Sequence, residues 1–231
     1  MPYPRALMLF AAGFGTRMGP LTASRPKPLI PVAGRTLLDH ALDQARAVPL
    51  DRTVVNVHYL ADQIRSHLAD RPEILIADET AEILETGGGL RAARPLLQSD
   101  PVFVMNSDGV WTGANPLQQL LTAWRPEDMD VLLLLLPAGQ FTAHRGTGDF
   151  LMDAHGRISR AKGQPGFSYI GAHISRTDRL DEIPDRAFSL NRLWDDAIAR
   201  GRAFGVLHQG GCADVGRPEG IAEAERLLAD V

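Results

Sequence analysis

Residues 6–19 read ALMLFAAGFGTRMG, an apolar run that ends in a loop with two glycines. Residues 6–10 have the length and the apolar character of a buried strand. Gly13 and Gly15 then allow the backbone to turn sharply and to present N–H groups to an anion. Since Gly-x-Gly is also common in structural turns, the loop alone leaves a plain turn and an anion-binding loop equally open.

The residues around this loop exclude two familiar nucleotide-binding motifs. A dinucleotide fingerprint, as in an oxidoreductase, requires a glycine or alanine where Met18 stands and an acidic residue at the end of the second strand. That strand is predicted at residues 53–57, which read TVVNV and are followed by His58. A Walker A loop requires a Gly-Lys pair, and the sequence contains none. The loop is therefore of another kind.

Strand-length apolar runs alternate with segments of helical periodicity along the chain. We expect strands at residues 6–10, 53–57, 73–77, 102–105, 131–136, 148–152, 157–160, 167–174 and 204–208. We expect helices at residues 37–47, 61–69, 90–97, 116–124, 190–200 and 218–228. In the first half this alternation predicts an α/β fold with a parallel sheet covered by helices on both faces.

The composition is that of an ordinary globular protein of 231 residues, with a formal net charge of −4. This mild acidity gives no reason to expect nucleic acid or an anionic membrane as a partner, so phosphates would have to be bound by a local group of cations. The single cysteine, Cys212, excludes an intramolecular disulfide and a cysteine-based zinc site. Because the apolar runs are too short for a signal peptide or a membrane span, we expect a cytoplasmic protein.

Two cations follow the glycine loop. Arg17 comes directly after it, and Lys27 lies in the stretch RPKPLIP, residues 25–31. The prolines on both sides of Lys27 fix the chain direction and predict that no helix forms there. A planar guanidinium and a point-like ammonium suit the oxygens of a triphosphate. The alternative is an exposed proline loop with a solvated lysine.

Two aspartates are candidates for a metal site. Asp108 follows the predicted strand at 102–105, and the carboxyl ends of parallel strands are where open α/β sheets bind ligands. An Asp-Gly pair after a strand is otherwise a common turn. Asp214 lies in GCADVG, residues 211–216. Two carboxylates suit Mg²⁺, which needs few protein ligands. The other acids, such as Asp195 and Asp196, are expected on a solvated helix face.

These motifs together resemble those of the sugar-1-phosphate nucleotidyltransferases. The resemblance is carried by residues 11–18 (AAGFGTRM), 26–29 (PKPL), 31–32 (PV) and Gly34. It implies a Rossmann-like three-layer α/β/α sandwich with a mixed, mainly parallel central sheet. It also implies a single domain over residues 1–231, with the nucleotide bound by about the first 112 residues and the sugar by the remainder. The implied reaction joins a nucleoside triphosphate to a sugar 1-phosphate and releases pyrophosphate.

The resemblance also implies roles for individual residues. Arg17 and Lys27 would be catalytic, with Lys27 stabilising charge at the phosphorus under attack, and Asp108 and Asp214 would hold Mg²⁺. The implied nucleotide contacts are Ala11, Ala12, Gly13, Gly15, Thr16, Arg17, Glu85, Thr86, Gly87, Gly88 and Asn106. The implied sugar contacts are Gly148, Asp149 and Lys162. The motif around Asp214 departs from the family, which usually has an aromatic residue near position 212 and a threonine near position 217.

Several positions keep a second interpretation. The glycines at 87–89 precede a predicted helix, so we expect a loop that lets a flat base approach and leaves helix N–H groups free, with a structural glycine turn as the alternative. Lys162 could equally be a loop lysine in water. His144 and His173 lack the spacing of metal ligands and are given no role.

Within the family, the chain is similar to the branch that acts on N-acetylmuramate α-1-phosphate. The compact length, residues 85–89, the pair Trp111-Thr112 and residues 148–150 carry this similarity, although Gly109 is an extra residue beside Asp108. It implies UTP as the second substrate and a role in cell-wall recycling. On charge alone, Arg145 or Arg160 would pair with the lactyl carboxylate of that sugar.

Other substrates and another class of protein stay open at this point. Glucose 1-phosphate with UTP or dTTP, and mannose 1-phosphate with GTP, are alternative substrate pairs. A nucleotide-sugar sensor without catalytic activity is an alternative of a different class.

Overall fold

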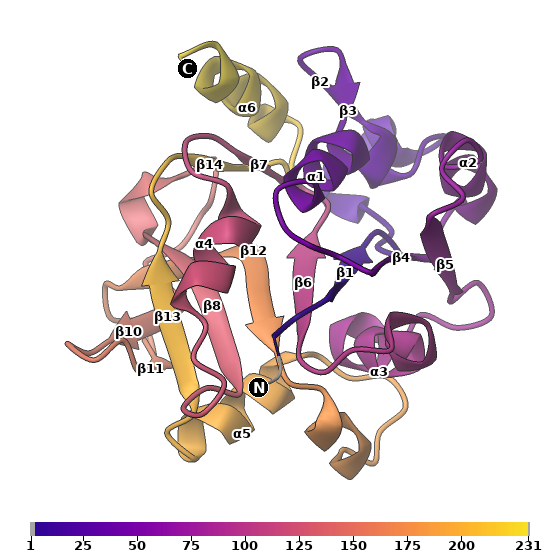
Figure 1. Cartoon of the computed structure of the whole chain (residues 1–231). Coiled ribbons are helices and arrows are strands. Elements are labelled where there is room, and N and C mark those ends of the chain that lie inside the picture. The colour runs from indigo at the N-terminus through magenta and orange to yellow at the C-terminus, as the bar shows by residue number, and fades with distance from the viewer. Residues whose placement is uncertain (1–2, 231) are drawn as a thin grey trace.

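A nine-stranded sheet forms the middle layer of the computed structural model, which describes residues 3–230 (Figure 1). Its strands are β1 (Ala6–Phe10), β4 (Arg52–Val57), β5 (Ile74–Asp78), β6 (Val102–Asn106), β8 (Val131–Pro137), β10 (Phe150–Met152), β11 (Ile158–Arg160), β12 (Phe167–Ser175) and β13 (Ala203–Leu207). The neighbours β6, β1, β4 and β5 run parallel. Because β12 runs antiparallel to both β6 and β8, the sheet is mixed, as the resemblance implies.

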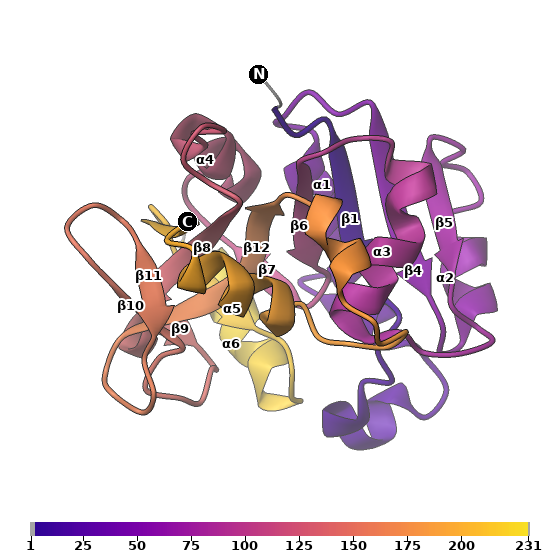
Figure 2. The same cartoon turned by 90° about the horizontal axis from the view of Figure 1, so that it is seen from below.

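Helices cover both faces of this sheet. One face carries α1 (Leu37–Ala45), α2 (Ala61–His67) and α4 (Pro116–Ala123), and the other carries α3 (Glu85–Leu97), α5 (Asn191–Ala199) and the 3-10 helix η4 (Asp178–Glu182). Successive strand residues face opposite sides, so Leu7 and Leu9 join the first core while Ala6 and Met8 join the second. The predicted three-layer α/β/α arrangement is confirmed. The β10–β11 hairpin lies at the end of the sheet opposite β5 (Figure 2).

The short elements are the ones that the sequence did not predict. They are β2 (Pro31–Val32), β3 (Arg35–Thr36), β7 (Gly109–Trp111), β9 (Phe141–Thr142), β14 (Cys212–Asp214), and the 3-10 helices η1 (Thr16–Thr22), η2 (Lys27–Leu29), η3 (Ala138–Gln140) and η4 (Asp178–Glu182). Strands of two or three residues are too short to show a period of two. They form here because distant segments meet: β14 pairs with β7 and β9, and helix α6 (Glu219–Ala229) lies beside the β2–β3 hairpin (Figure 1).

No helix within residues 3–230 combines the length and the hydrophobicity that a membrane span requires.

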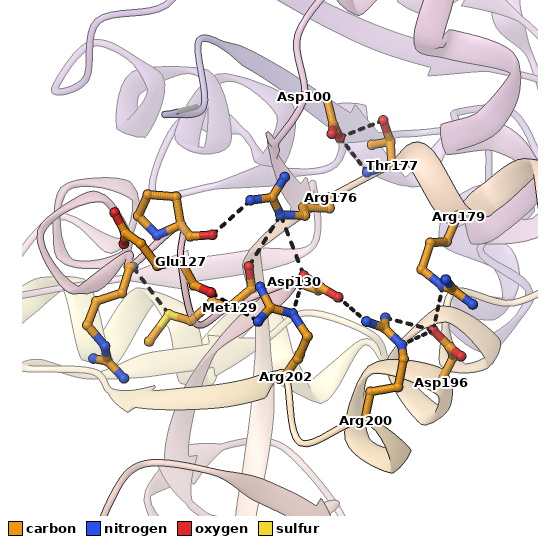
Figure 3. A network of polar contacts seen from close by, with 12 residues as sticks. Asp100, Glu127, Met129, Asp130, Arg176, Thr177, Arg179, Asp196, Arg200 and Arg202 are labelled. Atoms are coloured by element: carbon orange, nitrogen blue, oxygen red, sulfur yellow. Dashed lines mark hydrogen bonds and ion pairs between the residues drawn. The ribbon is translucent and has the colours of Figure 1, made fainter. Parts of the chain in front are cut away.

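A cluster of arginines around Asp130 ties together the ends of three strands (Figure 3). Asp130 lies just before β8 and is only 8% exposed. Its carboxylate accepts hydrogen bonds from Arg200 and from Arg202 Nε (2.8 Å), and Arg176 Nε lies 3.5 Å away. Burial would raise the pKa of Asp130, but the hydrogen bonds from these arginines lower it below its usual value. Asp196, on the partly exposed face of α5, pairs with Arg200 at the edge of this cluster.

We expect Asp130→Ala to reduce the free energy of unfolding by about 2–4 kcal/mol, because it leaves three neighbouring arginines without their carboxylate. Urea unfolding at neutral pH measures this change. The matched control is Asp128→Ala, since Asp128 is 58% exposed and forms an exposed ion pair with nearby Arg125, so we expect a loss of about 0.5 kcal/mol or less. Because the folded pKa of Asp130 is lowered, its contribution should be present above about pH 4 and lost as the pH falls further. Equal unfolding free energies for the two variants would contradict this role.

Candidate active site

Two adjoining cavities open where β1 and β6 end. The first, of about 230 Å³, is lined by the loop after β1, by Lys27 and Asp108, and by the start of α3. The second, of about 280 Å³, is lined by residues of β10–β12 and α5. Phe10, Thr86 and Asn106 line both cavities, so a ligand in one would lie next to a ligand in the other. Their position at the carboxyl ends of parallel strands is the one expected for an open α/β sheet.

A buried polar network holds the loop after β1 in place. Asn56 on β4 accepts a hydrogen bond from Ala11 N (2.7 Å) and donates one to Glu79 Oε1 (2.7 Å). The other oxygen of Glu79 accepts a hydrogen bond from Leu84 N (3.2 Å), just before α3. Sequence reasoning missed Asn56 and Glu79. The available signal was the polar Asn56 inside the apolar run at 53–57, since a buried amide requires partners.

Gly15 allows the glycine loop to lie against Lys27. It adopts a left-handed conformation with φ of 65°, and a Cβ there would lie 3.0 Å from Lys27 Cβ and 2.9 Å from Thr22 Cγ2. Both the backbone conformation and the close approach therefore require glycine. The hydroxyl of Thr22 donates to the carbonyl of Gly15 (3.0 Å) and holds the turn. Thr16 begins η1 and, like Arg17, is exposed.

Lys27 contacts Asp108 directly. Its Nζ lies 2.5 Å from Asp108 Oδ2, and both side chains are largely buried. The prediction that prolines prevent any helix here was wrong, because Lys27–Leu29 forms a single 3-10 turn. Pro28 lies near the N-terminal end of this turn. Proline is tolerated there because its missing N–H would have no helical partner. Burial would raise the pKa of Asp108, but the charge and the hydrogen bond of Lys27, together with Arg17, lower it below its usual value.

The second carboxylate is brought close by the short strand β14. Asp214 lies opposite Gly109 in the β7–β14 pair, and Val215 N donates to the backbone oxygen of Asp108 (2.9 Å). Burial and the negative charge of Asp108 raise the pKa of Asp214, although Lys27, Arg17 and His144 oppose the shift. The structure thus brings the two predicted metal residues together. Sequence reasoning gave His144 no role, yet its Nδ1 lies 3.7 Å from Asp214 Oδ2.

Two carboxylates are a donor set that a magnesium ion could use. Within residues 3–230, no group of three or more His, Cys, Asp and Glu is arranged to hold a metal. Mg²⁺ takes one or two carboxylates and completes its shell with water and phosphate oxygens. Burial is the largest cause of the raised pKa of Asp214 and the charge of Asp108 adds to it, so a cation bound beside Asp214 would lower that pKa.

The glycine run at 87–89 has a different role from the predicted one. It lies inside α3, which begins at Glu85, and not in a loop before the helix. A Cβ at Gly87 would lie 2.3 Å from the Phe188 ring, and one at Gly88 would lie 2.4 Å from Arg186 O. The N–H groups of both glycines donate to Phe188 O, so they are not free for a ligand. These glycines allow the segment at residues 186–188 to approach the helix. Of the predicted nucleotide contacts at residues 85–88, Glu85 and Thr86 line the first cavity.

The predicted sugar contacts are only partly brought together. Asp149 lines the second cavity, where its Oδ2 accepts a hydrogen bond from Tyr169 N (2.9 Å). Gly148 stands beside it with φ of 120°, against the backbone of Gly166. Lys162 lies in an exposed turn and lines neither cavity.

We expect Asn56→Ala to weaken the binding of a nucleoside triphosphate by about tenfold, because the loop at residues 11–13 loses its anchor on β4. Isothermal titration calorimetry measures this affinity. Asn115→Ala is the matched control, since Asn115 caps α4 by accepting hydrogen bonds from Leu117 N and Gln118 N. It should lower the unfolding midpoint without changing the affinity. Unchanged nucleotide binding in Asn56→Ala would refute the anchoring role.

Comparisons with known proteins agree with this geometry. The family described as "MobA-like NTP transferase domain" matches residues 7–167. N-acetylmuramate alpha-1-phosphate uridylyltransferase of Caulobacter vibrioides is 42% identical over 98% of this chain and 98% of its own length. The protein of the same name from Neisseria meningitidis is 33% identical over 95% of this chain and 96% of its own length. A crystal structure of UDP-glucose pyrophosphorylase complexed with UDP-glucose shares the fold, with a TM-score of 0.78 and 16% identity over 98% of this chain and 99% of that chain. The chain therefore belongs to the MobA-like NTP transferase family and is, as its motifs predict, a sugar-1-phosphate nucleotidyltransferase.

Proposed function

We propose that the protein transfers a uridylyl group from UTP to N-acetylmuramate α-1-phosphate, giving UDP-N-acetylmuramate and pyrophosphate. Two relatives with this activity in their names match nearly the whole chain, at 42% and 33% identity. The sequence similarity at residues 85–89, 111–112 and 148–150 points to the same substrates. A cytoplasmic location and a role in cell-wall recycling accompany this substrate and belong to the same proposal.

The observation that carries the proposal is the contact between Lys27 and Asp108 on the wall of the first cavity. It places a cation and a carboxylate beside the glycine loop, with a second cavity next to them. The nucleotide would occupy the first cavity, against Ala11, Ala12 and Gly13, and the sugar phosphate would occupy the second. The proposed nucleotide-binding part, up to about residue 112, and the proposed sugar-binding part belong to one domain. They are not strictly separate, because Thr86 and Asn106 line both cavities.

The proposed reaction is a direct displacement at the α-phosphorus. An oxygen of the sugar phosphate attacks, a new P–O bond forms, and the bond to the β-phosphate breaks to release pyrophosphate. A phosphate monoester is already ionised at neutral pH, so neither a protein nucleophile nor a strong base is required. Lys27 and Arg17 would neutralise the developing negative charge, and the loop at Gly15 and Thr16 would position the triphosphate.

Asp108 and Asp214 would hold Mg²⁺ in this scheme. The ion would reduce the repulsion between the two phosphate-bearing substrates when both are bound. Lys27 contacts Asp108 in the structure, so it would have to share or release that carboxylate when the ion binds.

A panel of substrate pairs tests the proposed specificity. With Mg²⁺ present, we expect pyrophosphate release to have the highest kcat/KM for UTP with N-acetylmuramate α-1-phosphate, by about tenfold over glucose, mannose or N-acetylglucosamine 1-phosphate with any nucleotide. EDTA should abolish turnover, and added Mg²⁺ should restore it. Faster turnover with glucose or mannose 1-phosphate would overturn the choice of sugar. Tight nucleotide binding without pyrophosphate release from any pair would indicate a nucleotide-sugar sensor.

We expect Lys27→Ala to lower kcat by about 10²-fold or more, on the scale of a lost charge contact in the transition state. Lys162, the only other lysine in the sequence, provides the matched variant. Because Lys162 is exposed and outside both cavities, Lys162→Ala should change kcat/KM by no more than about threefold. Wild-type turnover in Lys27→Ala would exclude a catalytic role, and a large loss in Lys162→Ala would support its predicted contact with the sugar phosphate.

A further inference from the structure

Within residues 3–230, the second cavity is lined by a single guanidinium group and by no lysine. Arg160, at the end of β11, is the only arginine among its lining residues. Its neighbour His173 does not supply a second cation, because burial lowers the pKa of His173 to about 3. Asp149, on the same wall, is an acceptor and not a source of positive charge. Any anionic substituent that enters this cavity therefore has one partner of opposite charge.

We infer that Arg160 selects a sugar phosphate that carries a carboxylate, by binding that carboxylate in the second cavity. The inference rests on the proposed function, in which the sugar is N-acetylmuramate and bears a lactyl carboxylate. A carboxylate that lost water on entering this cavity without a cation would be costly to bind. The guanidinium offers a positive charge and, on Nη1, N–H donors that a carboxylate oxygen can accept.

The surroundings of Arg160 fix its orientation and leave donors available. Its guanidinium carbon lies 4.8 Å from the centre of the Phe150 ring. Nε donates to Asp195 Oδ1 (2.7 Å), and Nη2 donates to Asn191 Oδ1 (2.8 Å). Arginine has five N–H donors, and within the described part of the chain Nη1 makes no hydrogen bond. The side chain is thus held on one side and can meet a carboxylate with the other.

The ion pair with Asp195 does not remove the charge that a ligand would meet. Asp195 has a side chain that is 59% exposed, so water screens its interaction with Arg160. A carboxylate in the cavity would be less exposed to water and would interact more strongly. The aromatic and aliphatic walls, from Phe150, Leu190 and Trp194, suit the methyl groups of an acetamido and a lactyl substituent.

Charge alone suggested either Arg145 or Arg160 as the partner of the lactyl carboxylate, and the structure distinguishes between them. Arg145 lines neither cavity, and its side chain is 73% exposed. Its Nη2 pairs with Glu219 Oε1 at 3.2 Å. Arg145 is therefore the matched control for a substitution at Arg160.

The test compares two sugar phosphates that differ only in the lactyl group: the α-1-phosphates of N-acetylmuramate and N-acetylglucosamine. We expect Arg160→Gln to lower kcat/KM for N-acetylmuramate 1-phosphate by about 10- to 100-fold, mainly through KM, because a charged hydrogen-bonded contact is lost. The value for N-acetylglucosamine 1-phosphate should change by about threefold or less. Arg160→Lys should fall between wild type and Arg160→Gln, since lysine keeps the charge but loses the contacts that hold the guanidinium in place. Arg145→Gln should keep the wild-type ratio.

Three results would overturn the inference. Equal losses for both sugars in Arg160→Gln and Arg160→Lys, with normal unfolding midpoints, would assign Arg160 a structural role. A wild-type ratio in both variants would mean that another group reads the carboxylate. Loss of the ratio in Arg145→Gln would assign the carboxylate to Arg145. Failure of the proposed function would look different, because the wild-type protein itself would then show no preference for the lactyl sugar.

Discussion

The contact between Lys27 and Asp108 joins segments 81 residues apart and holds a cation and a carboxylate at the carboxyl end of the parallel strands. Two features of the structure bring other groups to this contact. Gly15 must lack a side chain so that the glycine loop can lie against Lys27, and β14 must pair with β7 so that Asp214 reaches the same place. Burial raises the pKa of Asp214, and the negative charge of Asp108 raises it further.

The two cavities are lined by different cations. The chain is mildly acidic as a whole, so it attracts phosphates only where cations are concentrated. In the first cavity, Lys27 faces the glycine loop and can meet a triphosphate. In the second cavity, Arg160 is held at the wall by Phe150, Asp195 and Asn191. A substrate with a phosphate at one end and a carboxylate at the other would match this separation of cations.

Buried polar groups away from the reacting atoms give the site its shape. Asn56 and Glu79 link the loop after β1 to β4 and to the segment before α3, and the low-polarity interior makes each unpaired group costly. The glycines of α3 also shape the site, because their lack of a side chain lets the ring and the carbonyl of Phe188 lie against the helix. Asn56 and Glu79 also line the first cavity, so they help to determine where its walls lie.

The sequence alone predicted the long strands and helices and a sheet covered on both faces, and it singled out the glycine loop, Lys27, Asp108 and Asp214, which the structure brings to one end of the sheet. Periodicity and motif spacing are local properties, and they extend over enough residues to be read without a structure. Only the tertiary structure decided that β14 pairs with β7, that Asn56 anchors the loop, that the glycines at 87–89 face Phe188 and that Arg160 lines the second cavity while Arg145 does not. Each of these depends on pairing between distant segments, and a two- or three-residue strand or a single arginine carries no local signal of its partner.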